Sequence, residues 1–521
     1  MSSFKVIIVG GGLGGSLLAN GLLNNDVDFT LYERDSADSK REGYQIRMGD
    51  AALEGFEACL TSDHAAAITS KLGMSSNLSS TAPILCTSQF KVVLDLSQLP
   101  SYSRSAAINR VVLRNLLLAP VQKANYVEFE KAFSRFEIIR QDDGQERVKV
   151  HFADGSFDLC DVLVGADGSG SKINKQIGAR NIVDIDSHWC FVQKGSLPPS
   201  RVKMLPPRLL QGPIIVFSEG YSFFFALYLP PSTNGVSKDA KQLEYNIDEA
   251  SFYWGLNVPK AKFPGLDISE SGNHLRVVLE AIKHWAPVYH TMVSIGEHDG
   301  ATPIISLNLR ASKTLSKTWR RDLQPQSPEE GHPRVWLMGD AIHAMQPNRQ
   351  VQLRELSLQG MGGNQALRDC VDLLPPLLQL NEAAKSGTSP STVEVKKALA
   401  VYESKMIDRA FAWVQKSGGA SVPDLIKDSF DSRDDRSLAM AALLTQRDEN
   451  PDFDGATIEA PTSDTQDETL ETPADSASGK RSSHDHKAPD LHDNTTIAHA
   501  SLWSRLFKRY DCNLCTDIIK T

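Results

Sequence analysis

The feature that most restricts the fold of this chain is a glycine cluster at residues 10–15. It follows an apolar segment at residues 4–9, which predicts a buried strand, and it precedes a helical pattern at residues 16–23. Gly10, Gly12 and Gly15 have the spacing in which successive glycines permit a tight turn, close approach to a pyrophosphate, and close packing of helix on strand. The segment therefore predicts a βαβ unit that binds a dinucleotide at a helix N-terminus.

An acidic residue at the end of the next predicted strand supports this interpretation. Glu33 follows the segment 29–32 and lies eighteen residues after Gly15, where a carboxylate can accept hydrogen bonds from both ribose hydroxyls. The glycine motif alone does not separate FAD from NAD. Because it occurs only once, the sequence predicts no second Rossmann domain dedicated to a nicotinamide cofactor.

The composition sets the class of protein. A chain of 521 residues with 41% hydrophobic side chains can bury a core and is long enough for two or three domains. We find no window of about 18 apolar residues and no signal-peptide layout, so we expect a soluble, cytoplasmic protein. The seven cysteines have no framework spacing, which predicts reduced thiols, and the terminal pair Cys512 and Cys515 is interpreted as incidental.

The charge distribution argues against one class of partner. Residues 451–500 hold 11 acidic and 3 basic side chains, which account for most of the formal charge of −9. The rest of the chain is close to neutral and has no basic stripe, so we expect no nucleic-acid partner.

We predict four segments. Residues 1–184 and 326–420 form the two parts of a dinucleotide-binding domain, the latter with a closing helix, and the aromatic-rich residues 185–325 form a second, mainly β domain that holds the substrate. Residues 421–521 are a largely disordered tail, because the polar composition near 447–500 cannot offset the entropy of folding. Within this tail, residues 502–510 have a composition that supports a short helix and at most a weak, reversible contact with a membrane surface.

Two further motifs end predicted strands with small residues and a carboxylate. They are Gly165-Ala-Asp167-Gly168 after residues 161–164, and Gly339-Asp340-Ala-Ile-His343 after residues 335–338. Each alone is also typical of an ordinary capped helix. Taken in order with the glycine cluster, they resemble the single-component flavoprotein monooxygenases, a family that contains para-hydroxybenzoate and salicylate hydroxylases and many enzymes of fungal secondary metabolism. The resemblance covers roughly the first 415 residues.

The resemblance implies an α/β fold with a glutathione-reductase-type Rossmann domain that binds FAD. In this family the glycine cluster contacts the pyrophosphate, Glu33 the adenosine ribose, Arg110 and Asp340 the ribityl region, and Asp167 both FAD and the visiting nicotinamide. The implied cofactor-binding residues are Gly10, Gly12, Leu13, Gly15, Glu33, Arg110, Asp167, Gly168, Gly339, Asp340, Pro347, Gly362, Gly363 and Asn364.

The implied activity is oxygenation of a small aromatic or polyketide-like substrate. NAD(P)H would reduce FAD, and O₂ would form a flavin C4a hydroperoxide that hydroxylates or epoxidises the substrate. We name no catalytic residue, expect no metal, and interpret His343 as structural. The run Phe223-Phe224-Phe225 is interpreted either as sheet core or as a pocket wall. The alternatives are a flavin-dependent dehydrogenase or halogenase, or a catalytically impaired paralogue.

Two departures from the family pattern support the last alternative. Asn174 stands where the family usually has arginine, which removes a potential phosphate or substrate partner. More seriously, residues 350–359 separate Pro347 from the glycine loop at residues 360–364, whereas the family has only two residues there. We expect this insertion either to bulge into solvent or to displace the loop from the flavin ring.

Overall fold

The computed structural model describes residues 4–37, 45–72, 83–95, 106–142, 144–229, 250–266, 268, 274–297, 303–346, 361–387 and 389–420. These residues belong to one compact unit. Pro347, the insertion at 350–359 and the tail at 421–521 lie outside the described residues, so the expectations for them stay predictions.

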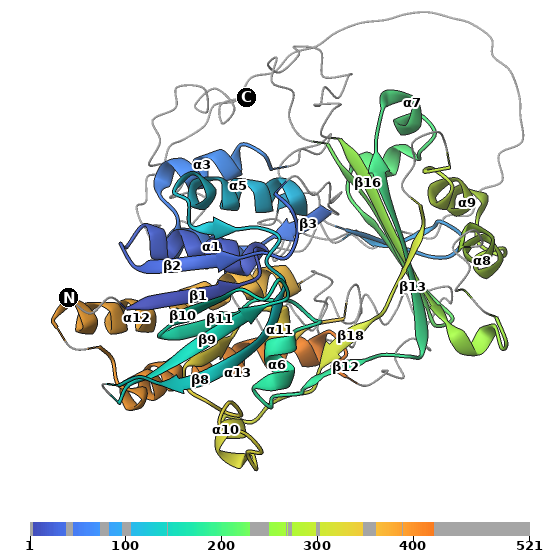
Figure 1. Ribbon diagram of the computed structural model, residues 1–521. Helices are drawn as coiled ribbons and strands as arrows, with labels where there is room; N and C mark the ends of the chain where they lie inside the picture. Colours follow the sequence, from blue (N-terminus) through green and yellow to red (C-terminus); the bar gives the residue numbers. More distant parts are fainter. Residues whose placement is uncertain are drawn as a thin grey trace, which may run out of the picture. The chain divides into compact units, whose positions relative to one another are not determined.

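A five-stranded parallel sheet forms the first half of the core (Figure 1). The strand order is β19-β11-β1-β2-β7. Because parallel strands in such a sheet are buried on both faces, the central strands are mostly apolar, as in the sequence KVIIV of β1. The strands are β1 (Lys5–Val9), β2 (Asp28–Tyr32), β7 (Val127–Glu128), β11 (Val162–Gly165) and β19 (Val335–Leu337).

Helices pack against this sheet, and α1 contacts both α5 and α12, while α12 also contacts α2 and α13. The helix predicted at residues 16–23 is present as α1, which begins inside the glycine cluster. The helices are α1 (Leu13–Leu23), α2 (Asp50–Cys59), α3 (Ser62–Thr69), α5 (Arg110–Lys123), α12 (Met361–Lys385) and α13 (Thr392–Lys416).

A three-stranded antiparallel sheet is made of β8 (Phe133–Arg140), β9 (Glu146–Phe152) and β10 (Phe157–Cys160). The sequence pattern of residues 148–152 and 161–164, with Asp154-Gly155 between them, predicts a hairpin, and the structure corrects this. The turn at residues 153–156 instead joins β9 to β10, and the chain then enters the parallel sheet as β11. Strands β10 and β11 follow one another and are separated only by Asp161.

A seven-stranded, mainly antiparallel sheet forms the second half of the core, in the order β17-β13-β16-β15-β14-β4-β5. One of its faces packs on α8 (His274–Ala281) and α9 (Pro287–Val293) through a cluster that includes Phe223, Phe225 and Trp254 (Figure 1). Its strands are β4 (Ile84–Cys86), β5 (Val92–Asp95), β13 (His188–Ser196), β14 (Ile214–Ser218), β15 (Tyr221–Tyr228), β16 (Ser251–Pro259) and β17 (Ile305–Leu307).

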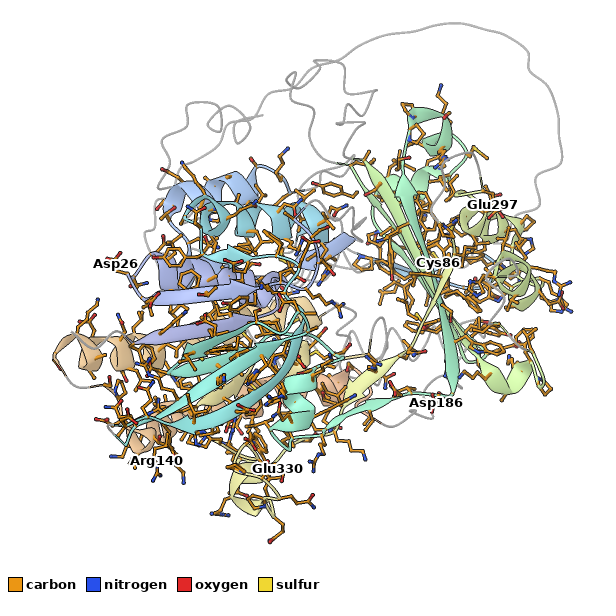
Figure 2. The ribbon with its side chains drawn as sticks, in the orientation of Figure 1. Asp26, Cys86, Arg140, Asp186, Glu297 and Glu330 are labelled. Atoms are coloured by element: carbon orange, nitrogen blue, oxygen red, sulfur yellow. The ribbon has the colours of Figure 1, made fainter. Side chains whose placement is uncertain are left out.

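The membership of β4 and β5 differs from the expectation for residues 1–184. Both strands belong to the seven-stranded sheet, because β4 pairs in parallel with β14, and Cys86 is buried among the side chains of that sheet (Figure 2). A domain boundary placed at a single position in the sequence separates β4 from β14, because these paired strands are more than 100 residues apart in the chain. The domain boundaries at 184, 325 and 420 stay predictions.

Two small two-stranded sheets occur as well: β3 (Gln45–Met48) with β6 (Ala106–Asn109), and β12 (Ile182–Asp184) with β18 (Arg310–Ser312). The short helices are α6 (Lys172–Gln176), α7 (Pro199–Val202), α10 (Trp319–Asp322), α11 (Asp340–His343), η2 (Pro207–Leu210) and η3 (Lys260–Lys262). Among the described residues, no helix combines the length and the apolar character needed to cross a bilayer. The five cysteines in the described part of the chain are free and buried, as expected.

Candidate cofactor-binding site

The sequence motifs meet at one edge of the parallel sheet. β1 ends before Gly10, β2 before Glu33, β11 before the turn with Asp167, and β19 shortly before Asp340. All four strands run in the same direction, so their carboxyl ends and the residues that follow lie along one edge. In open parallel sheets this edge is where ligands bind.

The glycine cluster combines tight packing with one open position. Gly10 has a φ of +115°, and a Cβ there would lie 2.2 Å from the Ala166 carbonyl oxygen; a Cβ on Gly15 would lie 2.1 Å from the Gly10 oxygen. Only glycine is compatible with such backbone contacts. By contrast, a Cβ on Gly12 would meet nothing within 4 Å. Gly12 is the N-cap of α1 and no side chain caps this helix, so its N-terminus is suited to an anion.

Glu33 is held beside this loop by backbone and side-chain hydrogen bonds. Its Oε2 accepts from the Gly11 N–H at 3.0 Å and its Oε1 accepts from the Asp35 N–H at 3.0 Å. The carboxylate is therefore fixed in position by backbone donors, which is the arrangement that a ribose-binding acid requires.

Arg114 completes this arrangement and was given no role by the sequence analysis. Its Nη2 lies 3.2 Å from Glu33 Oε2, and its Nε donates to the Gly11 carbonyl at 2.7 Å. The side chains of both charged residues are less than a tenth exposed. The signal in the sequence was a charged residue at a core position of α5, between the fully buried Leu113 and Leu117.

Asp340 begins α11 and is the exposed acid of the site. Burial by the surrounding protein raises the pKa of this carboxyl, while the positive charges of His343 and Arg110 oppose the rise. Solvent reaches the side chain although most of its surroundings are protein, as expected for a carboxylate that a bound molecule would cover. A Cβ on Gly362 would lie 3.5 Å from Asp340 Oδ1, so the start of α12 is close to the acid.

The turn after β11 is built around Asp167, whose Oδ2 accepts from the Lys172 N–H at 2.9 Å at the start of α6. Burial raises the pKa of Asp167, and the hydrogen bonds from this helix start oppose the rise. Gly168 has a φ of +76°, and a Cβ there would meet nothing within 4 Å. Gly12 and Gly168 are thus two open glycines on neighbouring strand ends.

Two further residues expected at the cofactor, Gly363 and Asn364, lie at the start of α12. A Cβ on Gly363 would lie 3.7 Å from Leu13 Cδ1, so the start of α12 approaches the start of α1. The side chain of Asn364 is buried and forms hydrogen bonds with the main chain. Its Oδ1 accepts from the Gly49 N–H, and its Nδ2 donates to the Arg47 carbonyl. Asn364 therefore ties α12 to the segment after β3, and a flavin contact through its side chain is left without support.

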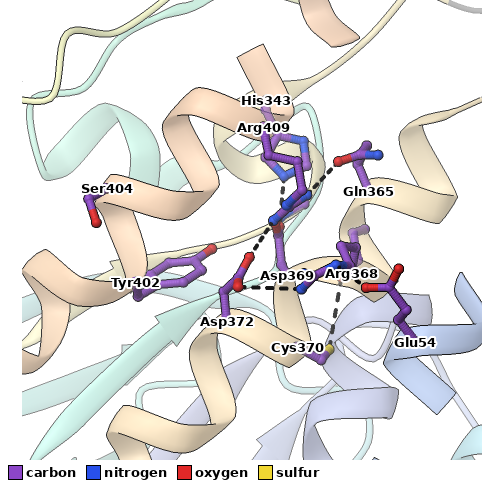
Figure 3. Close-up of polar contacts among 12 residues, drawn as sticks. Glu54, His343, Gln365, Arg368, Asp369, Cys370, Asp372, Tyr402, Ser404 and Arg409 are labelled. Atoms are coloured by element: carbon purple, nitrogen blue, oxygen red, sulfur yellow. Dashed lines mark hydrogen bonds and ion pairs between the residues drawn. The ribbon is translucent and has the colours of Figure 1, made fainter. Parts of the chain in front are cut away.

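A buried ionic network is centred on Asp369 of α12 (Figure 3). Asp369 accepts from the Gly339 N–H at 2.8 Å, and its carboxylate lies 2.7 Å from both His343 Nε2 and Arg409 Nη2. Burial alone would raise the pKa of Asp369, but His343 and Arg409 outweigh it and hold the pKa at about 2. The fully buried His343 thus shapes the turn that presents Asp340, which supports its structural interpretation.

The asparagine that replaces the expected arginine also has a structural partner. Asn174 Nδ2 donates to Asn181 Oδ1 and to the Ala341 carbonyl, both at 2.8 Å, and Asn181 Nδ2 donates to the Ile342 carbonyl at 2.8 Å. The two amides therefore bind the backbone of α11. As for metals, the described residues contain no group of three or more side chains suited to hold one.

Comparisons with known proteins agree with this geometry. Residues 3–203 match the family model described as an FAD binding domain. Over 417 residues the chain is 25% identical to the chloroplastic zeaxanthin epoxidase of Nicotiana plumbaginifolia, covering 77% of this chain and 52% of that protein. Over 444 residues it is 23% identical to the dual O-methyltransferase/FAD-dependent monooxygenase CTB3 of Cercospora beticola, covering 78% and 45%. The chain thus spans about half the length of these relatives.

Solved structures show the same fold. Klebsiella pneumoniae HpxO complexed with FAD and uric acid has a TM-score of 0.55 and 18% identity, covering 86% of this chain and 92% of that chain. Pseudomonas aeruginosa PqsL in complex with 2-aminobenzoylacetate has a TM-score of 0.55 and 17% identity, covering 85% and 99%. Residues 3–203 therefore match an FAD binding domain, and the described chain shares the fold of these solved structures.

Proposed function

We propose that this chain is an FAD-dependent monooxygenase that uses NAD(P)H and O₂ to hydroxylate or epoxidise a small aromatic or polyketide-like substrate. The observation that carries the proposal is the meeting of four separate motifs at the carboxyl ends of β1, β2, β11 and β19. Motifs more than 300 residues apart in the chain then act on one extended cofactor. The relatives, which include an epoxidase and a monooxygenase, support the same activity.

The described residues are suited to the adenosine ribose, the pyrophosphate and the ribityl part of FAD. Glu33 would accept hydrogen bonds from the adenosine ribose, and the uncapped N-terminus of α1 at Gly12 would hold the pyrophosphate. Arg110 and Asp340 would bind the ribityl region, with Asp340 as acceptor for its hydroxyls. The open position at Gly168 gives a second place where backbone can approach the cofactor or the nicotinamide.

When bound and reduced by NAD(P)H, FAD supplies the activated oxygen, and the protein contributes position and environment. The start of α12 at residues 361–363 would lie along the flavin, since Gly362 approaches Asp340 and Gly363 approaches Leu13. The buried Asp369 carboxylate stabilises the turn before Asp340, because it accepts a hydrogen bond from the Gly339 N–H and also contacts His343 Nε2. The seven-stranded sheet would cover the substrate and exclude water from it.

The test begins with the absorbance spectrum of the purified full-length protein, before and after addition of FAD. We expect a flavin spectrum, oxidation of NADH or NADPH that a panel of phenols stimulates, and consumption of O₂ matched to oxygenated product. Protein that takes up no FAD would exclude the proposal. Stimulated NAD(P)H oxidation without O₂ consumption would point instead to a dehydrogenase.

A further inference from the structure

Helix α11, which presents Asp340, is too short to hold its own position. It has four residues, and the carbonyl groups in the last turn of a helix find no partner within the helix. Here the carbonyls of Ala341 and Ile342 accept hydrogen bonds from two asparagine side chains. The carbonyl of Ala344, directly after the helix, accepts from the Ser312 N–H of β18 at 2.9 Å. The position of α11 therefore depends on these donors from outside the helix.

The two asparagines are Asn174 of α6 and Asn181, and both are almost fully buried. Asn174 Nδ2 donates to the Ala341 carbonyl and to Asn181 Oδ1, each at 2.8 Å. Asn181 Nδ2 donates to the Ile342 carbonyl at 2.8 Å and to the Lys313 carbonyl at 3.0 Å. All four N–H groups of the two amides are thus donated. We call this buried pair, Asn174 and Asn181, the amide bridge.

The amide bridge also reaches the turn of Asp167. The Asn174 N–H donates to Ser171 Oγ at 2.8 Å, at the start of α6. In the same helix turn, the Lys172 N–H donates to Asp167 Oδ2 at 2.9 Å. The Asp167 turn follows β11 and α11 follows β19, and these two strands are neighbours in the parallel sheet. The amide bridge thus joins the two carboxylate-bearing turns, at Asp167 and at Asp340, across adjacent strand ends.

The same pair is attached to the segments that connect the two larger sheets. Asn181 immediately precedes β12, which leads into β13, and Lys313 immediately follows β18, which comes after β17 (Figure 1). β12 and β18 pair with each other, and the Lys313 N–H donates to the Asn181 carbonyl at 2.7 Å. Asp340 is therefore held against the place where the chain passes between the parallel sheet and the seven-stranded sheet.

The chemistry of the amide bridge explains why asparagine stands at position 174. An amide supplies two N–H donors, and the acceptors that they face are the Ala341 carbonyl and Asn181 Oδ1. A carboxylate of the same shape would place an oxygen against both acceptors. Arginine, the residue expected here from the family, would bring a charge into a position that is 1% exposed, where a charge without an ionic partner is costly.

We propose that Asn174 and Asn181 are positioning residues for the cofactor, and that they act by holding Asp340 in place beside the Asp167 turn. Solvent reaches the Asp340 side chain, so a carboxylate that is not held in position is hydrated instead of accepting from the ribityl hydroxyls. The two asparagines are buried and act on the cofactor only through Asp340. This inference rests on the proposed function, because it assigns the amide bridge to the FAD site of that enzyme.

The test is a double-mutant cycle on FAD affinity, measured by flavin fluorescence with the full-length protein after removal of bound FAD. We expect Asp340→Asn to weaken FAD at least about tenfold, as for a lost hydrogen bond to a charged group, and Asn174→Ala to weaken it about three- to tenfold. Because Asn174 acts through Asp340, the double variant should bind FAD like Asp340→Asn alone, within about twofold. Losses that multiply in the double variant would show a purely structural role and overturn the proposal, as would wild-type affinity in Asn174→Ala.

Asn24→Ala is the matched control. Asn24 Nδ2 also donates to a main-chain carbonyl, that of Cys59, but it lies at the end of α1 far from the glycine cluster. This variant should change FAD affinity by less than about twofold, with or without Asp340→Asn. Thermal midpoints are compared first, and Asn181→Ala, which removes the donor to Ile342, enters the same cycle where Asn174→Ala does not fold.

Asn174→Arg restores the residue that is usual in the family and decides between the two explanations of position 174. It should weaken FAD at least as much as Asn174→Ala, because it removes the amide bridge and buries a charge. Tighter FAD binding in Asn174→Arg would mean that the position lacks a cation, and would overturn the proposal. A wild type that takes up no FAD would instead refute the proposed function itself.

Discussion

At the level of single residues, the buried acids Glu33 and Asp369 are each paired with an arginine, Arg114 and Arg409 respectively. Glu33 and Arg114 both form hydrogen bonds with the backbone of Gly11. The Gly11 N–H donates to Glu33, and the Gly11 carbonyl accepts from Arg114. Desolvated charges are costly unless they are paired and hydrogen-bonded. The pair thus holds the glycine loop and the Glu33 carboxylate in a fixed orientation. Arg114 would affect ribose binding indirectly, by positioning Glu33.

We expect Glu33→Ala to weaken FAD by about 1.5–3 kcal/mol, the usual range for hydrogen bonds to a charged group. Arg114→Met should weaken FAD in the same direction, because an unpaired Glu33 is no longer held in place. FMN lacks the adenosine ribose, so neither variant should change its affinity. Titrations followed by flavin fluorescence measure both ligands, and equal losses for FAD and FMN would show that Glu33 does not bind this ribose.

Asp369 determines how the site responds to acid. Its pKa in the folded protein, about 2, is below its ordinary value of 3.8. The stability it contributes is therefore present above pH 3.8 and is lost as the pH falls toward 2. We expect Asp369→Asn to lower the free energy of unfolding at pH 7 by about 3 kcal/mol or more, as for a broken buried ion pair.

The same variant should show a shallower loss of stability between pH 4 and pH 2 than the wild type. Urea unfolding at several pH values measures both effects. Asp408→Asn is the matched control, since Asp408 pairs with Lys317 at the surface, and it should change stability by less than about 1 kcal/mol. An acid response that is identical in Asp369→Asn and wild type would show that other carboxyl groups dominate.

At the scale of elements, the first strand, loop and helix separate two roles for glycine. Gly10 and Gly15 allow α1 to approach β1 and β11, whereas Gly12 has open space around it. Packing and ligand binding thus depend on different glycines of one motif. Helix α12 approaches α1 at Gly14, where a Cβ would lie 3.1 Å from the Ala366 carbonyl oxygen, and Asn364 anchors the start of α12.

This division predicts opposite outcomes for two alanine substitutions. Gly12→Ala should leave the stability of the FAD-free protein within about 0.5 kcal/mol of wild type, because its φ of −75° suits alanine and nothing is near its Cβ. It should nevertheless weaken FAD at least about tenfold, since the methyl group would meet the pyrophosphate. Gly15→Ala should destabilise the FAD-free protein by about 2 kcal/mol or more.

Thermal and urea unfolding without FAD, followed by FAD titration, distinguish the two variants. Normal FAD affinity in Gly12→Ala would mean that the pyrophosphate does not approach residue 12. Unchanged stability in Gly15→Ala would mean that the contact with the Gly10 carbonyl relaxes easily.

At the scale of the whole molecule, several contacts hold the C-terminal end of α13 to the rest of the described chain. Gln346 Nε2 donates to the Gly419 carbonyl at 2.6 Å, Gln415 Nε2 donates to Thr314 Oγ1 at 2.5 Å, and Val414 is fully buried. Tyr402 fastens the same helix to β19 through the Leu337 carbonyl. These contacts hold α13 and the residues just after it against the rest of the described chain.

Truncation after residue 446 keeps all of these contacts. We expect the shortened protein to retain its flavin content and a thermal midpoint within about 2 °C of the full chain. A second truncation after residue 410 removes Val414 and Gly419 and should lower both clearly. A large loss in the first variant would show that the polar segment after residue 446 contributes to folding or to FAD binding.

The sequence alone determined the parts of this protein that depend on local pattern. A strand, a glycine turn and a helix at residues 4–23, and carboxylates after three further strands, follow from hydrophobic periodicity and from the stereochemistry of glycine. That these residues meet at one edge follows from the parallel pairing of the strands in the structure. The local sequence pattern did not predict the pairings between segments that are distant in the chain.

Only the tertiary structure decided those pairings. It placed Arg114 against Glu33 and Asp369 against Arg409, and it used Asn364 as an anchor for the backbone of residues 47–49. It brought β4 and β5 into the second sheet and turned Phe224 away from Phe223 and Phe225. The physical reason is that such contacts depend on the free energy of the assembled core, to which residues tens or hundreds of positions apart contribute jointly.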